Sequence, residues 1–301
     1  MKVVVSGASG LIGSALVPAL VSAGHEVVSL VRRPASGPGE ISWDPAGGVI
    51  GPPGLDGADG VVNLSGTGIA DKKWTEARKQ EILSSRLDST RLLARTMATL
   101  DPLPRVFCSG SAVGWYGDTG PVARTEEDPA GPGFLADVVR QWEEAAQPAA
   151  DAGIRTVLLR TGVVLSAKGG ALAKQLPLFK LGLGGRFGRG DQYLAWVSVD
   201  DEVGAIVHCL THDDISGAVN VCAPAPVTNA EFATTLGKVL HRPTALPVPL
   251  FGPRLLFGRE VVDEMLLAGQ RVLPARLQSS GYQFQTPDLE SALRRVLDKP
   301  A

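Results

Sequence analysis

The chain has 301 residues, of which 44% are hydrophobic and 20% are charged, and its formal net charge at pH 7 is -2. This length suits one large domain with a smaller lobe, and the balance is typical of a globular protein rather than a nucleic-acid-binding one, which needs a basic surface. No stretch of about 20 uninterrupted apolar residues predicts a membrane span, so we expect a cytoplasmic protein without a membrane or nucleic-acid partner.

The N-terminal segment predicts a strand, a turn, a helix and a second strand. Residues 2–5 form a mainly β-branched run, as is typical of a strand buried on both faces of a sheet. A glycine-rich turn covers residues 6–13, and apolar residues then recur at helical spacing up to Gly24, which is expected just beyond the helix end. Residues 27–31 form the next strand, which completes a unit with the size of a βαβ crossover.

Strands and helices continue to alternate as far as residue 165. We predict strands at 60–64, 105–109 and 156–159, and helices at 76–100 and 134–150. Such alternation is typical of a parallel sheet covered by helices on both faces. The predicted fold class is therefore α/β, with a doubly wound Rossmann sheet at residues 1–165 to which later segments return.

The texture of the chain changes after residue 165. Residues 169–190 are rich in glycine, and residues 243–253 contain four prolines, which interrupt regular structure. We predict that residues 166–301 form mainly a smaller α/β lobe that supplies a pocket for a small-molecule substrate.

Within the first turn, Gly7, Gly10 and Gly13 fit the pattern G-x-x-G-x-x-G. Gly7 permits the tight turn out of the strand, Gly10 lets the backbone approach a pyrophosphate, and Gly13 lets the helix pack near the sheet. The helix N-terminus offers free N–H groups to the phosphates. The strand–turn–helix context predicts a dinucleotide site that also includes Ser9, Leu11 and Ile12.

The end of the second strand predicts which dinucleotide is bound. NAD-preferring folds place an acid there to accept from the ribose 2′-OH, but this strand ends Leu30-Val31-Arg32-Arg33. Two guanidiniums can instead hold a 2′-phosphate, so we predict NADP(H) as the cofactor, with contacts from Val31, Arg32 and Arg33. The alternative is that both arginines are solvated loop residues.

No metal site is predicted. Cys108, Cys209 and Cys222 lie in apolar runs without metal-ligand spacing, so we expect buried thiols in a reducing cytoplasm and no disulfide. His208 and His212 have the i, i+4 spacing of helical metal ligands, but no acidic or Cys partner accompanies them, which favours a surface pair.

Three segments together resemble the extended short-chain dehydrogenase/reductases, the superfamily of NAD-dependent epimerases and dehydratases. These segments are the glycine turn, residues 61–66 (VVNLSG) and residues 109–117 (SGSAVGWYG). More specifically, the chain is similar to an atypical subgroup called epimerase family proteins, which are grouped with sugar-nucleotide epimerases. The resemblance covers nearly the whole chain and implies further cofactor contacts from Leu64, Ser65, Gly66, Ser109, Val163 and Val164.

This chain departs from active members of the family that it resembles. Those members use a Ser to hold the substrate oxygen, a Tyr to transfer the proton and a Lys to lower the pKa of that Tyr. Ser111 matches the Ser, but the Tyr and Lys slots hold Leu135 and Val139, and neither can carry a proton. Tyr116 is a candidate catalytic substitute, the alternative being that it packs behind the nicotinamide.

A second departure lies in the long helix, where family members place Asn at the position of Arg86. The resemblance suggests that Arg86 faces the cofactor, where it would supply the positive charge lost with the Lys. Glu81, just over one turn earlier, would orient it. The alternative is an exposed helix surface.

We therefore expect an NADP(H)-binding oxidoreductase or epimerase-like enzyme that acts on a small polar substrate, with nucleotide sugars among the candidates. The alternative is a non-catalytic NADP(H)-binding or redox-sensing protein, which the missing Tyr and Lys favour. The resemblance also suggests a homodimer that pairs through two long helices.

Overall fold

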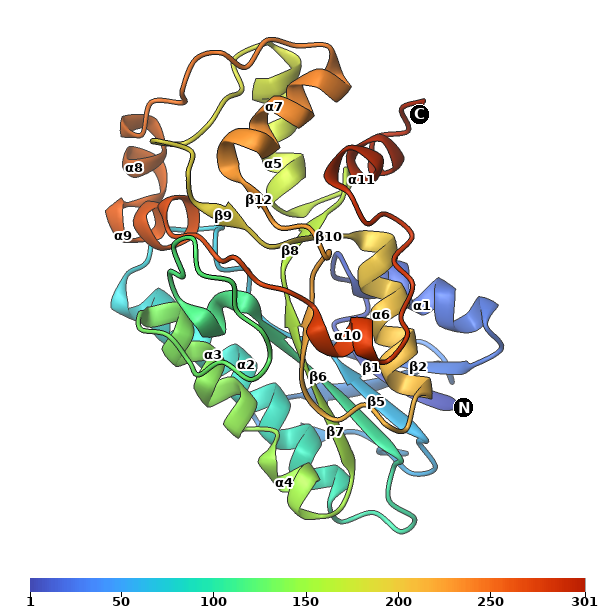
Figure 1. Ribbon diagram of the computed structural model, residues 1–301. Helices are drawn as coiled ribbons and strands as arrows, with labels where there is room; N and C mark the ends of the chain where they lie inside the picture. Colours follow the sequence, from blue (N-terminus) through green and yellow to red (C-terminus); the bar gives the residue numbers. More distant parts are fainter. Residues whose placement is uncertain (301) are drawn as a thin grey trace.

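The structure, a computed structural model, describes residues 1–300. Its centre is an eight-stranded sheet with the order β11-β7-β6-β5-β1-β2-β3-β4 (Figure 1). Every neighbouring pair is parallel except β3 and β4. The strands are β1 (Lys2–Ser6), β2 (Glu26–Val31), β3 (Glu40–Asp44), β4 (Val49–Ile50), β5 (Gly60–Asn63), β6 (Val106–Ala112), β7 (Arg155–Thr161) and β11 (Gly217–Val221). The predicted Rossmann class is confirmed, and all five predicted strands are present.

The side chains of β1 alternate between two hydrophobic cores. Val3 and Val5 face a core built with α1 (Gly13–Ser22) and α6 (Val199–Thr211), whereas Val4 faces a core built with α2 (Glu76–Met97) and α4 (Gln147–Asp151). Successive strand residues point to opposite faces, so a run of three valines contributes to both cores. For this reason the central strand is continuously apolar rather than alternating.

The structure differs from the predicted elements in two places. The helix predicted at 134–150 is divided into α3 (Phe134–Glu144) and α4, because Pro148 occupies the first turn of a new helix. The hairpin of β3 and β4 is absent from the prediction. Its signal is nevertheless local, since the apolar residues Ile41 and Trp43 alternate with polar ones in the sequence EISWD, as is typical of a strand. Both apolar side chains are buried in the structure.

Most of the chain after residue 162 forms a second core beside the sheet (Figure 1). Two short ladders join β8 (Val163–Leu165) to β10 (Trp196–Ser198) and β9 (Tyr193–Leu194) to β12 (Val227–Thr228). The helices of this lobe are α5 (Gly170–Lys180), α7 (Asn229–Leu240), α8 (Phe251–Phe257), α9 (Arg259–Val262), the π-helical turn η2 (Asp263–Leu267) and α11 (Leu289–Val296). In contrast, β11 is the edge strand of the sheet, and α6 and α10 (Ala275–Ser279) pack against the sheet, so the later chain contributes to both parts.

Candidate functional site

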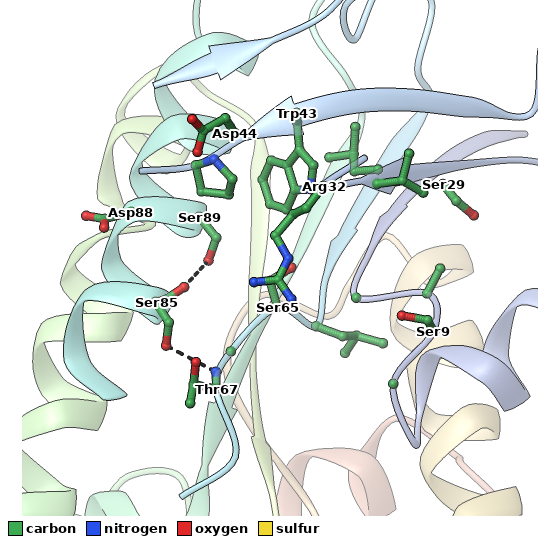
Figure 2. Close-up of a pocket in the computed structure, with 18 of the residues that line it drawn as sticks. Ser9, Ser29, Arg32, Trp43, Asp44, Ser65, Thr67, Ser85, Asp88 and Ser89 are labelled. Atoms are coloured by element: carbon green, nitrogen blue, oxygen red, sulfur yellow. Dashed lines mark hydrogen bonds between the residues drawn. The ribbon is translucent and has the colours of Figure 1, made fainter. Parts of the chain in front are cut away.

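A cavity of about 1160 Å³ opens at the carboxyl ends of β1, β2 and β5 (Figure 2). The chain runs from β1 to β2 on one side, whereas β5 lies on the other side of β1, so the strand order reverses here. Open α/β sheets bind ligands in the crevice at such a reversal. The predicted cofactor residues that line the cavity are Gly7, Ser9, Gly10, Val31, Arg32, Arg33, Leu64, Ser65, Gly66 and Glu81.

Other predicted cofactor residues do not line this cavity, and their contact with a cofactor stays a prediction. They are Leu11, Ile12, Gly13, Arg86, Ser109, Val163 and Val164. Residues of the unpredicted hairpin line it instead, with Trp43 and Asp44 at the end of β3 (Figure 2). The alternating pattern of β3 is the signal that would have placed them here.

The three glycines of the turn meet different surroundings. A Cβ on Gly13 would lie 2.2 Å from the Gly7 carbonyl oxygen, and a Cβ on Gly7, whose φ is +72°, would lie 2.7 Å from the Leu64 carbonyl carbon. Packing alone therefore requires glycine at both positions. A Cβ on Gly10 would meet only the Gly7 oxygen, at 3.2 Å, and Gly10 lines the cavity. The open space over Gly10 fits a ligand that approaches the backbone closely.

The N-terminus of α1 is open to an anion. Its N-cap residue is Ile12, which makes no side-chain cap. The Ser14 and Ala15 N–H groups already donate to carbonyl oxygens of the turn, so the free donors here are the N–H groups of Leu11, Ile12 and Gly13, which have no partner among residues 1–300. The first N–H groups of a helix have no intrahelical partner, and together with the helix dipole they favour phosphate groups. The turn and α1 thus have the features that a pyrophosphate needs.

The structure separates the two arginines that the sequence placed together. Arg33 forms a two-bond ion pair with Glu40, with N–O distances of 2.8 and 2.6 Å. Hydrogen bonds from Arg33, and then from Ser36, lower the pKa of the Glu40 carboxyl to about 2. Arg32 has no hydrogen-bond or ion-pair partner among residues 1–300, and its side chain extends across the cavity in front of Trp43 (Figure 2). Arg32 is therefore the free cation of the pair.

Hydroxyl and amide groups hold the opposite wall in place. The Ser6 hydroxyl donates to the Asn63 side-chain oxygen at 2.6 Å, and the Asn63 amide donates to Thr90 at 2.8 Å. The Thr67 N–H donates to the Ser85 hydroxyl at 3.1 Å (Figure 2). These bonds fasten the ends of β1 and β5 to α2.

Arg86 lies next to the slot where the family that this chain resembles has its Lys. Its guanidinium donates to the Thr67 and Ile82 carbonyl oxygens and lies 5.1 Å from the centre of the Trp142 ring, one turn beyond Val139 in α3. Burial, and then the charge of Arg78, lower the pKa of Arg86 to about 10, so it stays protonated at neutral pH. No carboxylate among residues 1–300 pairs with it.

Glu81 does not orient Arg86 as expected. Its carboxylate instead pairs with Arg78, at 2.7 Å. Arg78 is almost fully buried, and it also donates to the Gly68 carbonyl oxygen. No sequence motif singles out Arg78, because its burial depends on the loop at residues 66–69, whose Gly68 carbonyl oxygen it contacts.

Ser111 and Tyr116 belong to a buried polar network. The Ser111 hydroxyl donates to Glu143 at 2.6 Å, and Arg160 donates two bonds to the same carboxylate at 2.8 and 2.9 Å. Arg160 also donates to the Tyr116 hydroxyl at 3.0 Å, and that hydroxyl donates to Asn220 at 2.7 Å. Burial raises the pKa of Tyr116 to about 12. These contacts are those of a packed structural Tyr, and a catalytic role for either hydroxyl stays a prediction.

The Tyr and Lys slots are filled by apolar contacts. Leu135 and Val139 both approach Gly114, where a Cβ would lie 3.6 Å from Leu135 and 3.8 Å from Val139. Val139 is 4% exposed. No proton donor therefore occupies the usual place on α3.

The part of the chain that the structure describes has neither a metal site nor a membrane-spanning helix. Among residues 1–300, no group of three or more His, Cys, Asp or Glu side chains is placed to hold a metal ion. No helix in the same range is long and apolar enough to cross a membrane. The three cysteines are buried, as predicted.

Comparison with known proteins gives two family matches. The model of the NAD dependent epimerase/dehydratase family matches residues 3–222, and a domain of unknown function, DUF1731, matches residues 248–296. An epimerase family protein of Mycobacterium bovis is 44% identical over 298 residues, which cover 99% of this chain and 98% of that protein.

Solved structures agree with these matches. The crystal structure of the human epimerase family protein SDR39U1 with NADPH superposes with a TM-score of 0.92, at 38% identity and 99% coverage of both chains. A nucleoside-diphosphate sugar epimerase from Corynebacterium glutamicum superposes with a TM-score of 0.81, at 35% identity, over 99% of this chain and 58% of that one.

Proposed function

The chain belongs to the NAD dependent epimerase/dehydratase family, and from this membership we propose that it binds NADP(H) and acts as an oxidoreductase or epimerase-like enzyme on a small polar substrate. The observation that supports NADP(H) as the cofactor is the position of Arg32. Its free guanidinium extends into the cavity at the place where NAD-preferring folds have an acid. The human relative that was crystallised with NADPH supports the same cofactor.

The cavity fits such a dinucleotide. The open face of Gly10 and the free N–H groups of Leu11, Ile12 and Gly13 would hold the pyrophosphate, and Arg32 would hold the 2′-phosphate. Arg33 would contribute less, because Glu40 already neutralises it. When bound, NADP(H) supplies hydride chemistry, and the protein contributes binding, orientation and charge.

Arg86 is the residue that we propose as the substitute for the missing Lys. It is a partly buried cation without a carboxylate partner, beside Gly66 at the edge of the cavity and next to Trp142 on α3. A cation there would stabilise negative charge on a substrate oxygen or on the dinucleotide. Substrates that carry a carbonyl or a hydroxyl, nucleotide sugars among them, meet this requirement, and the nucleoside-diphosphate sugar epimerase of C. glutamicum supports that class.

A second candidate function is NADP(H) binding without catalysis, as in a redox sensor. Leu135 and Val139 favour it, since neither can transfer a proton, and Ser111 and Tyr116 already bond to Glu143 and Asn220. The two candidates differ in what happens to the cofactor once it is bound.

The test has two measurements on the full chain. Calorimetric titration with NADPH and with NADH is expected to show tighter binding of NADPH, and tighter binding of NADH would contradict the proposed cofactor. Nicotinamide absorbance is then followed in the presence of a panel of nucleotide sugars and small carbonyl compounds. A substrate-dependent change supports the enzyme, whereas tight NADPH binding without turnover of any member of the panel supports the sensor.

A further inference from the structure

The exposed apolar side chains of the chain are concentrated at one end of the lobe. Eleven large hydrophobic residues are exposed among residues 1–300, and seven of them lie between residues 178 and 256. Six of these seven side chains are 66% to 80% exposed. We call these six residues, together with three neighbouring cations, the outer lobe surface. Its members are Leu181, Leu183, Leu246, Phe251, Leu255 and Leu256, with Lys180, Arg186 and Arg242.

The two segments that form this surface lie side by side. The Arg242 guanidinium donates to the Lys180 carbonyl oxygen at 2.7 Å, and the Val248 N–H donates to the Arg186 carbonyl oxygen at 2.9 Å. The helix α8 follows directly, and none of its residues is buried. Residues 180–186 and 242–248 thus lie side by side at the end of the lobe, and α8 is the next element along the chain.

The cations of this region outnumber the acids that pair with them. Residues 170–190 contain four lysines or arginines and residues 241–259 contain three, and neither segment contains an Asp or Glu, although the whole chain carries -2. Four of these seven cations, Lys174, Arg189, Arg254 and Arg259, pair with acids, and two of the acids, Asp191 and Asp263, lie within four residues of the segment ends. Lys180, Arg186 and Arg242 are exposed and have no carboxylate partner among residues 1–300. Large exposed apolar patches mark interaction sites, and here the patch has free positive charge beside it.

This charge determines the kind of partner. A symmetric dimer through the same surface would bring the cations of one copy against those of the other, which is unfavourable. A family dimer was predicted to pair through two long helices, and the helices α2 and α3 carry no large exposed hydrophobic residue. In α8, Phe251, Leu255 and Leu256 are all exposed, so this helix adds apolar surface beside the cations.

We propose that the outer lobe surface binds an anionic phospholipid surface. Leu and Phe side chains insert shallowly into the interface, and Lys180, Arg186 and Arg242 meet the phosphate headgroups. The protein then lies on the membrane without crossing it, which agrees with the lack of a membrane-spanning helix among residues 1–300. The sequence prediction of no membrane partner rested only on the lack of a spanning segment.

The test is sedimentation of the full chain with vesicles. We expect it to pellet with phosphatidylcholine vesicles that contain phosphatidylglycerol, to be released by salt, and not to pellet with phosphatidylcholine alone. A failure to bind the anionic vesicles, or equal binding to both kinds, would overturn the proposal. So would a stable dimer in solution that the surface substitutions below convert to monomer.

Matched variants locate the contact. Each cation near an anionic bilayer contributes about 1 kcal/mol, or about fivefold, so the double variant Lys180→Glu, Arg186→Glu should bind about 25-fold more weakly. The triple variant Phe251→Ser, Leu255→Ser, Leu256→Ser should also lose binding. The control Arg91→Glu, Val21→Ser changes exposed residues elsewhere and should bind as the parent does. Unchanged NADPH affinity shows that each variant is folded, and equal loss in the control overturns the assignment.

Discussion

Glu40 holds Arg33 in a two-bond ion pair, and so neutralises one of the two arginines that follow β2 and line the cavity. The neighbouring Arg32 keeps its charge free. Two consecutive arginines that are equivalent in the sequence therefore have different expected roles, and this difference can be measured.

The variant Arg32→Ala should weaken NADPH binding by about 10- to 100-fold, since hydrogen bonds to charged groups contribute about 1.5–3 kcal/mol. NADH affinity should change little, because NADH has no 2′-phosphate. Calorimetric titration of both dinucleotides checks this. The matched control is Arg33→Ala, and a greater loss of NADPH affinity in that variant would show that the wrong arginine has been selected.

Two glycines of the first turn, Gly10 and Gly13, lie three residues apart and provide a pair of single variants with different expected effects. Gly13→Ala should destabilise the fold by about 1–3 kcal/mol or more, because the new Cβ would lie 2.2 Å from the Gly7 oxygen. Gly10→Ala should unfold close to the parent but bind NADPH more weakly, since its Cβ would point into the cavity. Urea unfolding and dinucleotide titration distinguish the two effects. The reverse pattern would contradict a pyrophosphate above Gly10.

Arg86→Met removes the charge next to Trp142 but keeps much of the side-chain volume. If Arg86 replaces the missing Lys, NADPH affinity or turnover should fall, while Arg86→Lys, which keeps the charge, should recover part of the loss. A purely structural role predicts loss of stability in both variants without a selective change in cofactor binding. Unchanged NADPH affinity and turnover in Arg86→Met would reject the proposed role.

The pair formed by Glu143 and Arg160 is expected to be important for stability. Both side chains are less than a tenth exposed, so Glu143→Gln would leave Arg160 buried without a counter-charge, at a cost of about 3–5 kcal/mol. The control Asp137→Asn changes an acid of the same helix whose pair with Arg140 is exposed, and it should cost at most about 1 kcal/mol. Urea unfolding compares the two, and similar values would contradict the role of the buried pair.

The features that the sequence predicts correctly are local ones. The run Val3–Val5, the spacing of Gly7, Gly10 and Gly13, and the position of Gly24 each depend on residues within one turn or strand, and the structure places them as expected. The hairpin that carries Trp43 also had a local signal, but its strands are short and lie between glycines and prolines.

The features that the sequence could not predict depend on contacts between distant residues. Arg33 differs from Arg32 because β3 brings Glu40 beside it, and Tyr116 is held by Asn220, 104 residues later in the chain. No spacing rule connects such pairs. The polar network around Ser111 therefore becomes visible only when β6, β7, β11 and α3 are assembled.

Glu202 should make the stability of the protein depend on pH. This residue of α6 is fully buried; one carboxyl oxygen accepts from the Thr161 hydroxyl at 2.9 Å, and the other has no partner among residues 1–300. Burial raises the pKa of Glu202 from 4.5 to about 8, against the opposing effect of the Thr161 hydrogen bond. The folded state therefore binds a proton that the unfolded state releases near pH 4.5, so this contribution to stability is complete below pH 4.5 and is lost as the pH rises to about 8.

The variant Glu202→Gln isolates this effect, because the amide keeps the shape of a protonated carboxyl and does not titrate. Between about pH 5 and pH 8 the free energy of unfolding of the parent should fall relative to that of the variant, by up to ~1.4 kcal/mol per pH unit. Urea unfolding of both proteins across this range measures the difference, and Glu290→Gln, a half-buried acid with a lowered pKa, provides the control. Parallel pH profiles for the parent and Glu202→Gln would show that Glu202 is ionised in the folded protein and that water or a rearranged side chain reaches its second oxygen.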